Sequence, residues 1–316
     1  MNATFDILGI TGPIYLAIAL GYFFTRRGVF ARADMQVFGK FTINLALPAL
    51  LFNALSQRSI GEILNAQYLL AYALGSMAVL LGGLFWARKV QGHTLSYSSM
   101  MAMGMSCPNS GFVGYPIMLL TLGPVAGVAL ALNMVVENLL LIPLLLAVAD
   151  SQGQPGQWKQ ALLQTLKGLV KNPMIIGIVA GFLFSLSGAQ MPAPFARTIN
   201  LFAQASAALS LFVIGGSLVG LKAGGLKGTV SQIAFGKLFL HPLAMWAVLM
   251  WAVPIADPAL RSAALLTGAL PMLGIYTILS QRHGHGAISA ATLLVTTVVS
   301  FFTLSGLLWV LQHHLL

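Results

Sequence analysis

The chain has 316 residues, of which 58% are hydrophobic and only 7% are charged, and its mean hydropathy is +0.89. A soluble domain carries about 25% charged residues, so this composition excludes a water-soluble globular protein. The formal net charge of +10 does not indicate a nucleic-acid partner, because the sequence contains no polybasic run with interleaved aromatic residues.

Hydropathy predicts ten membrane spans, each long enough to cross a hydrocarbon core of about 30 Å. In chain order they cover approximately residues 7–25, 35–55, 66–88, 97–121, 124–148, 171–189, 197–219, 229–252, 259–280 and 286–311. The longest connection, residues 149–170, is too short for a further domain. The sequence therefore predicts an all-α membrane protein with ten transmembrane helices.

Basic residues fall mainly in alternate loops between the predicted spans. Twelve lie on one side and three on the other: Arg26, Arg27, Arg32, Lys40, Arg88, Lys89, Lys159, Lys167, Lys171, Lys222, Lys227 and Arg282 against Arg58, Arg197 and Arg261. Because cytoplasmic loops carry the excess of positive charge, this asymmetry predicts that both termini lie outside, in the periplasm. Arg26 and Arg27 follow the first span, so we expect that span to be retained and not cleaved as a signal peptide.

The fourth predicted span is interrupted at its centre by the run Cys107-Pro108-Asn109-Ser110-Gly111. The ninth span is also interrupted, and its Pro271 and Gly274 repeat the spacing of Pro108 and Gly111. A spanning helix cannot leave backbone groups unpaired at mid-bilayer unless protein, water or a ligand satisfies them. Two such breaks in corresponding positions of two halves predict a substrate-binding site.

A weak internal repeat divides the chain into two five-span halves, residues 1–150 and 171–316. Landmarks of the first span recur 160 residues later in the sixth: Pro13, Gly21 and Gly28 as Pro173, Gly181 and Gly188. Five spans are an odd number, so the second half enters the membrane upside down, which predicts two inverted five-helix repeats with crossing fourth and ninth helices. Residues 151–170 connect the halves as a predicted amphipathic helix on the cytoplasmic surface.

Proline in a helix interior removes a backbone hydrogen bond and clashes with the preceding turn, so we expect the chain to unwind at Pro108. Asn109, Ser110 and Gly111 then begin a half-helix whose free N–H groups and positive dipole end attract a carboxylate. Cys107 is expected to pack as a small residue in preference to acting as a reactive thiol. The alternative to a site is a simple kink. The same alternative applies to Pro48, Pro143 and Pro242.

The second break is apolar, so Pro271 and Met272 are expected to supply backbone groups only. Glu137 and Lys237 are the acid and the base that the prediction places well inside spans, where ionisable groups are functional by default. Glu137 could carry a coupling proton, pair with Lys237 in a structural ion pair, or be solvated near an interface. Lys237 could also balance the charge of an anionic substrate.

Asparagines add candidate ligands for a substrate. Asn133 stands four residues before Glu137 and therefore shares a helix face with it. Asn44, four residues before Pro48, is a candidate cavity-lining residue, and Asn53 is a weaker one.

The motifs of membrane enzymes are missing from the sequence. It contains no HExxH pair, no paired aspartates and no G-x-S-x-G, so we expect no catalytic residues. His283 and His285 flank Gly284 in a predicted turn without a carboxylate close in sequence, so we expect neither a metal site nor a cofactor. An anion channel would be expected to have rings of charge or repeated filter carbonyls, which are not evident.

At these positions the chain resembles the auxin efflux carrier family, in its bacterial branch of malonate and malate permease-like proteins related to the plant PIN carriers. The matching stretches are Leu20–Phe23, Asn44–Phe52, Pro108–Gly114, Val136–Asn138, Lys237-Leu238 before His241-Pro242, and Gly268–Pro271. The resemblance implies the ten-helix fold, a homodimer, and elevator-like alternating access for an organic anion. It also implies that Asn109 and Asn133 occupy places comparable to carboxylate-binding asparagines. The third span lacks the acid and lysine found in the PIN relatives, so their coupling cannot be transferred.

The combined hypothesis is a secondary transporter for a small carboxylate, malonate or another dicarboxylate, in the inner (cytoplasmic) membrane. Its expected partners are that carboxylate, membrane lipid and either a coupling proton or Na⁺. The alternatives are a receptor or sensor that binds a carboxylate on the same fold, and an anion channel.

Overall fold

The computed structural model describes residues 3–58, 65–151, 163, 167–221, 227–274 and 276–314. Within these residues every regular element is a helix and there is no strand. Six described helices are long and apolar enough to cross a membrane: Arg32–Ser56, Ala66–Val90, Val125–Asp150, Ala193–Ser217, Gly228–Trp251 and Ile288–His313. Six of the predicted spans are confirmed in this sense, and the full ten-span inverted arrangement stays a prediction. Most of the predicted amphipathic connection, residues 151–170, lies outside the described residues.

The chain folds into two compact units, and each unit combines segments from both predicted halves. Unit 1 comprises Met1–Ala66, Ser110–Met134 and Val170–Gly220, and unit 2 comprises Gln67–Asn109, Val135–Leu169 and Leu221–Leu316. The unit boundaries therefore differ from the boundaries of the sequence repeat. One of them falls between Asn109 and Ser110, inside the first predicted break.

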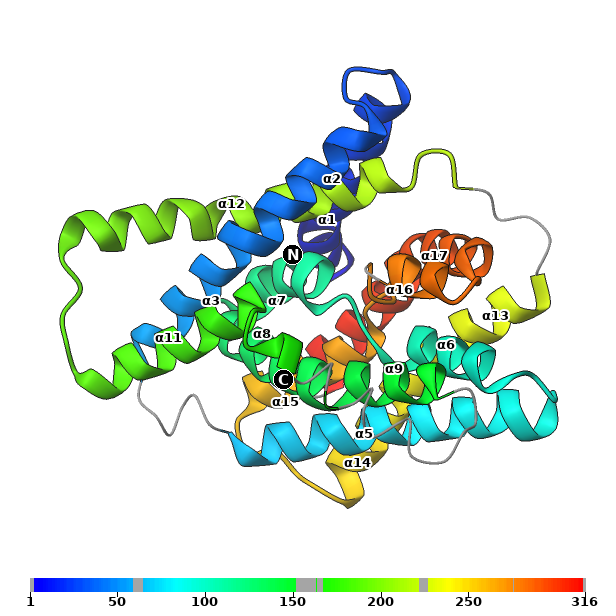
Figure 1. The fold of residues 1–316 in the computed structure, drawn as a ribbon. Coiled ribbons are helices and arrows are strands. Elements are labelled where there is room, and N and C mark those ends of the chain that lie inside the picture. The colour runs from blue at the N-terminus through cyan, green and yellow to red at the C-terminus, as the bar shows by residue number, and fades with distance from the viewer. Residues whose placement is uncertain are drawn as a thin grey trace. The chain divides into compact units, whose positions relative to one another are not determined.

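Unit 1 contains the following helices, in which η denotes a π-helix: α1 (Ala3–Arg26), α2 (Arg32–Phe41), η1 (Thr42–Ala46), α3 (Leu47–Ser56), η3 (Ser110–Gly114), α7 (Tyr115–Leu122), most of α8 (Val125–Val136), α11 (Pro173–Ser187) and α12 (Ala193–Ser217). Helices α3 and α11 run side by side, as the blue and green ribbons of Figure 1 show, and α12 packs on both α1 and α3.

Two close helix crossings in unit 1 have the same spacing as the sequence repeat. A Cβ atom added at Gly21 of α1 would overlap the backbone carbonyl of Phe212 in α12. A Cβ atom added at Gly181 of α11 would lie 2.9 Å from the carbonyl O of Phe52 in α3. Gly181 follows Gly21 by 160 residues, and Phe212 follows Phe52 by the same 160. Residues separated by the offset of the predicted repeat therefore make similar close contacts.

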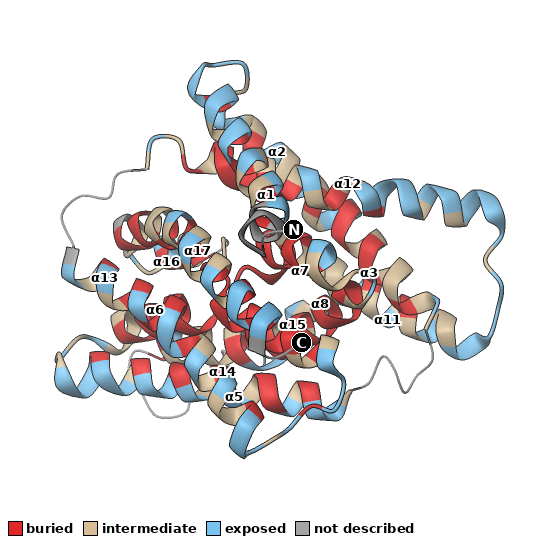
Figure 2. Cartoon of the chain, turned by 180° about the vertical axis from the view of Figure 1, so that it is seen from behind, coloured by how far each residue is buried: buried red, intermediate tan, exposed pale blue. Residues whose placement is uncertain are grey.

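Unit 2 contains α5 (Ala66–Phe85), η2 (Trp86–Val90), α6 (Leu95–Ser106), η4 (Glu137–Leu141), α9 (Ile142–Asp150), α13 (Lys227–Phe235), η5 (Gly236–Leu240), α14 (His241–Trp251), α15 (Pro258–Ala269), α16 (Tyr276–Arg282) and α17 (Gly286–His314). Nine of the twelve residues of α6 are buried, and so are nine of the twelve of α15, which makes these helices mainly red in Figure 2. The helices that lead into the predicted breaks thus lie in the interior.

Four of the described π-helices directly precede a helix whose second residue is proline. These prolines are Pro48 after η1, Pro116 after η3, Pro143 after η4 and Pro242 after η5. A proline ring clashes with the carbonyl four residues earlier and cannot donate to it, so the turn before it widens. The widened turns contain Asn44, Ser110, Glu137 and Lys237, all of which the sequence singles out. Prolines that could have been simple kinks therefore mark the altered turns in which these residues lie.

The crossings at Gly21 and Gly181 give a direct test of the packing in unit 1. The added methyl group would push α1 away from α12 in Gly21→Ala and α11 away from α3 in Gly181→Ala. Overpacking of this kind lowers the free energy of unfolding by about 1–3 kcal/mol. We expect both variants to unfold at lower temperature in detergent, with Gly21→Ala the more severe. Gly12→Ala is the matched control on α1, because a Cβ atom there meets nothing within 4 Å. Equal unfolding temperatures for all three variants would contradict these crossings.

Candidate functional site

The first break lies between α6 and α7. Thr94 caps the N-terminus of α6 by accepting a hydrogen bond from the Tyr97 N–H, and the helix ends at Ser106. Cys107 has an extended backbone (φ −99°, ψ 110°), and helical structure resumes at Ser110 in η3. Pro108 is the cause, because the residue before a proline is driven out of the helical region and proline has no N–H to donate.

The second break lies between α15 and α16 and has the same cause. Asp257 caps the N-terminus of α15, since its Oδ1 accepts hydrogen bonds from the N–H groups of Ala259 and Leu260. The helix ends at Ala269, and Leu270, which precedes Pro271, is extended (φ −60°, ψ 153°). Both predicted breaks are therefore present as interruptions of the helix.

The two breaks pair with each other inside unit 2. Pro108 and Met272 form an isolated antiparallel β-bridge. The Asn109 N–H donates to the Pro271 carbonyl O at 2.9 Å, and the Leu273 N–H donates to the Cys107 carbonyl O at 3.0 Å. Each break supplies hydrogen-bond partners for the other, as irregular backbone in the interior of a membrane protein requires.

This pairing limits what the first break can offer to a ligand. The sequence predicted free backbone N–H groups from Asn109 onward, but the Asn109 N–H is already donated to Pro271. Cys107 and Met272 are completely buried, and Asn109 is 2% exposed. Asn109 can therefore bind a ligand through its side chain, whereas its backbone holds the two breaks together.

Lys237, in η5, reaches the end of α15 just before the second break. Its Nζ donates to the Gly268 carbonyl O at 2.7 Å and is completely buried. The last carbonyls of a helix have no partner within the helix and carry its negative dipole end, so an ammonium group there is stabilising. A Cβ atom at Gly268 would lie 3.0 Å from the Cα of Pro242 in α14. Glycine at this position therefore permits the close packing of α15 against α14.

His241 connects Lys237 to α5. The Lys237 Nζ lies 2.7 Å from His241 Nδ1, and His241 Nε2 lies 2.9 Å from Ser76 Oγ. Because an ammonium group can only donate, Nδ1 is the acceptor and Nε2 carries the proton that it donates to Ser76. Within the described part of the chain, two of the three ammonium N–H groups thus have protein partners.

Glu137, in η4, is the second buried charge of unit 2, at 1% exposure. The Tyr72 hydroxyl on α5 donates to its Oε1 at 2.9 Å. Burial excludes the solvated interface role that the sequence left open, while proton coupling and pairing with Lys237 stay open. We call Tyr72, Ser76, Glu137, Lys237 and His241 the polar network of unit 2.

The remaining predicted residues lie in unit 1. Ser110 and Asn133 are completely buried, and a Cβ atom at Gly111 would lie 3.2 Å from Leu47 Cδ1. The Asn44 side chain is exposed, and its Nδ2 donates to the Lys40 carbonyl O one turn earlier at 2.7 Å. Asn44 therefore satisfies the backbone of its own widened turn.

The comparison with protein families is decisive for the class of protein. A family model described as membrane transport protein matches residues 11–308. The chain belongs to this family. The resemblance to the auxin efflux carrier family is thereby confirmed.

Two relatives align with this membrane transport protein over nearly its whole length. The "Putative malonate transporter" of Rhizobium meliloti (strain 1021) is 29% identical over 318 residues, which cover 97% of this chain and 96% of that protein. The "Uncharacterized transporter YfdV" of Escherichia coli (strain K12) is 28% identical over 314 residues, which cover 96% of each. The chain is therefore a multi-pass membrane transporter, and membership of the family implies a small-molecule substrate.

Sequence reasoning missed three members of the transporter's polar network. Tyr72 and Ser76 are ordinary residues of an apolar span, and only the fold brings them to Glu137 and His241. They stand four residues apart on α5, so they share a face of that helix. His241 carried an available signal, because it follows Lys237 by four residues and both lie within one predicted span.

A cavity of about 640 Å³ in unit 2 contains none of these residues. Its lining is apolar apart from Gln232 and the indole N–H of Trp86. Two of its residues, Phe235 and Leu243, are more than half exposed. In a membrane protein such a surface suits lipid chains, so size alone does not make this cavity the transport site.

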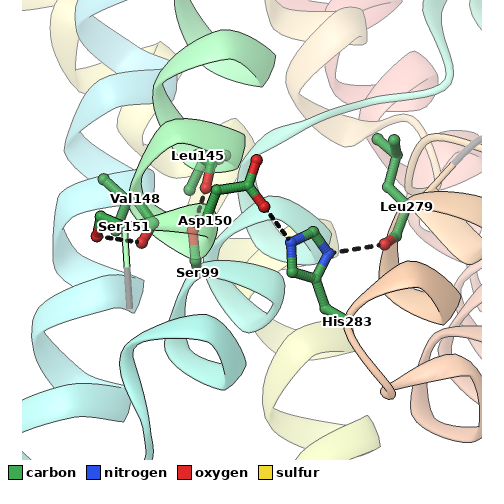
Figure 3. Close-up of polar contacts among 7 residues, drawn as sticks. All are labelled: Ser99, Leu145, Val148, Asp150, Ser151, Leu279 and His283. Atoms are coloured by element: carbon green, nitrogen blue, oxygen red, sulfur yellow. Dashed lines mark hydrogen bonds and ion pairs between the residues drawn. The ribbon is translucent and has the colours of Figure 1, made fainter. Parts of the chain in front are cut away.

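Figure 3 shows a contact between Asp150, the last residue of α9, and His283, the residue that follows α16. His283 Nε2 lies 2.8 Å from Asp150 Oδ1, and His283 Nδ1 lies 3.0 Å from the Leu279 carbonyl O. Both ring nitrogens of His283 thus lie within hydrogen-bonding distance of an oxygen. Burial, and then the neighbouring His283, lower the pKa of the adjacent His285. The sequence has no carboxylate close to His283, and the one that contacts it, Asp150, comes from α9. The described residues contain no group of three or more potential metal ligands.

The Tyr72–Glu137 contact predicts a measurable energetic coupling. Tyr72→Phe removes a donor from a buried carboxylate, which we expect to destabilise the protein by about 1–3 kcal/mol in thermal unfolding. The same substitution made in the Glu137→Gln protein should change the free energy of unfolding by a different amount. We expect the two changes to differ by about 0.5 kcal/mol or more. Tyr22→Phe, which removes a hydroxyl from a half-buried tyrosine of α1, is the control. Additive effects of the two substitutions would show that the hydroxyl does not act through Glu137.

Proposed function

We propose that this protein is a secondary transporter that moves a small carboxylate, malonate or another dicarboxylate, across the inner membrane by elevator-like alternating access. The observation that carries the proposal is the pairing of two helix breaks in unit 2, next to a buried lysine. Interrupted helices with a cation nearby are what a transporter needs to hold an anion inside the bilayer. The name of the 29% identical relative supports malonate as the first substrate to test.

In this proposal the carboxylate binds at the first break. Asn109 contributes its side chain, and Ser110 and Gly111 contribute the start of the half-helix, as the sequence predicts. Asn133 orients the substrate. Lys237 balances its negative charge with the third N–H group of the ammonium, and Glu137 serves charge balance or proton coupling.

Two features support the arrangement as inverted repeats. The Gly21–Phe212 and Gly181–Phe52 crossings are related by the offset of 160 residues, as a pseudo-two-fold axis requires. Similar landmarks also occur at the breaks, where Pro271 follows Pro108 by 163 residues. The elevator mechanism needs two bodies that can move against each other, and the division of the chain into two compact units fits that need. The predicted homodimer and periplasmic termini belong to the same proposal.

The test is uptake of labelled malonate and other small carboxylates by liposomes that contain only this protein. We expect Pro108→Ala to abolish uptake, because a residue with an N–H lets α6 continue and separates the paired breaks. Asn109→Ala should abolish uptake by removing the side-chain ligand. Both variants should still be inserted in the membrane. Pro192→Ala, at an exposed proline before α12, is the control and should transport normally.

Three results would change the proposal. Binding of malonate without flux through the wild-type protein would favour a receptor or sensor. Flux that does not saturate with substrate would favour an anion channel. Unchanged malonate binding by the Asn109→Ala protein would remove Asn109 from the site.

A further inference from the structure

Unit 1 contains a polar cavity that the sequence did not predict. Its volume is about 500 Å³, within the range of about 300–1,000 Å³ that is typical of small-molecule sites. It lies between α3, α12, α7 and the start of α8, and all of its lining residues belong to this unit. Neither the breaks nor the polar network of unit 2 contributes to it. The cavity is therefore a separate candidate site.

Two helices present matched pairs of carboxamides to this cavity. Asn53 and Gln57 stand four residues apart on α3 and at its C-cap, and Asn200 and Gln204 stand four residues apart on α12. Residues four apart lie on one face of a helix, so each pair points in one direction. The Gln57 Nε2 donates to the Asn53 Oδ1 at 2.8 Å, which holds these two amides together. The cavity therefore has four carboxamide side chains in its lining.

The charge of the cavity favours an anion. Arg58 lines it directly after α3, and none of the described lining residues is acidic. Tyr115, the first residue of α7, adds a phenolic hydroxyl. An arginine guanidinium matches the two oxygens of a carboxylate in a bidentate pair, and carboxamide N–H₂ groups donate to the remaining oxygens.

Small residues keep the floor of the cavity open. A Cβ atom at Gly127 of α8 would overlap the Cβ of Ala54 on α3, so these two helices pack closely at the cavity. Ala203 and Ala207 continue the α12 wall with short side chains. Larger residues at these positions would fill the space, so the cavity is a property of this sequence.

The cavity is bordered by the loop that follows α3 and by the turn at Pro124 between α7 and α8. Its α12 wall runs over residues 200–207. The positive-inside rule places these loops on the outer face. We infer that the cavity is an outer binding site for the same small carboxylates, with Arg58 as its charged anchor and the four carboxamides as its neutral donors. The inference rests on the proposed function for the identity of its ligand.

The test compares the dependence of malonate uptake on concentration between two arginine variants. Arg58→Gln should raise KM about tenfold, the effect of losing roughly one charge-assisted hydrogen bond, and leave the maximal rate unchanged. Arg58→Lys keeps the charge and should recover part of the affinity. Arg197→Gln, which removes an exposed arginine of α12 outside the cavity, is the matched control and should keep the wild-type KM. An equal rise in KM for Arg58→Gln and Arg197→Gln would mean general surface attraction and would overturn the inference.

A second variant protects the test against misfolding. Gln204→Leu alters an exposed side chain of the cavity wall, so the fold should persist while KM rises. The KM of the wild-type protein should increase with salt, and that of Arg58→Gln should increase less, because screening acts on the charge that this variant lacks. Normal KM in both cavity variants, with wild-type uptake intact, would overturn the cavity site alone. Absence of uptake of any small carboxylate by the wild-type protein would overturn the proposed function together with this ligand.

Discussion

The structure depends on one constraint, which is that backbone polar groups in the interior of a membrane protein must have partners. Prolines interrupt two buried helices, and the freed groups pair across the breaks through Asn109 with Pro271 and Leu273 with Cys107. Neither break could be tolerated alone at this depth, because each one supplies the donors and acceptors of the other. The breaks therefore form a single structural feature that joins two segments more than 160 residues apart.

The buried charges of unit 2 obey the same constraint. Lys237 donates a hydrogen bond to the C-terminal end of α15, where the break at Pro271 interrupts the helix. His241 lies within hydrogen-bonding distance of both Lys237 and Ser76. Glu137 is held by Tyr72 from the same helix, α5. Without partners these ionised groups would be strongly destabilising in a low-dielectric interior. The described contacts of the network give these buried side chains polar partners.

Local chemistry decided what the sequence could predict. Long apolar runs predict helices, and the matched spacing of Pro108–Gly111 and Pro271–Gly274 predicted breaks at these two prolines, so both features could be read from the residues. The offset of 160 residues between Gly21 and Gly181 predicted a repeat, but the helix crossings that these glycines make became visible only in the structure. Tyr72, Ser76 and Arg58 could not be identified, because their importance comes from neighbours far away in sequence. The pairing of Asn109 with Pro271 also required the structure, since the half-helix was expected to leave that N–H for a ligand.

The location of these contacts bears directly on how transport could proceed. If the two units move against each other, any hydrogen bond between them at mid-membrane must break and leave polar groups without partners. The break-to-break pairing avoids this penalty, because all four of its backbone groups lie in unit 2. The contacts described for the polar network also lie within unit 2, and the glycine crossings lie within unit 1. Each unit can therefore keep these contacts during a displacement, which is the property that distinguishes a moving body from a flexible chain.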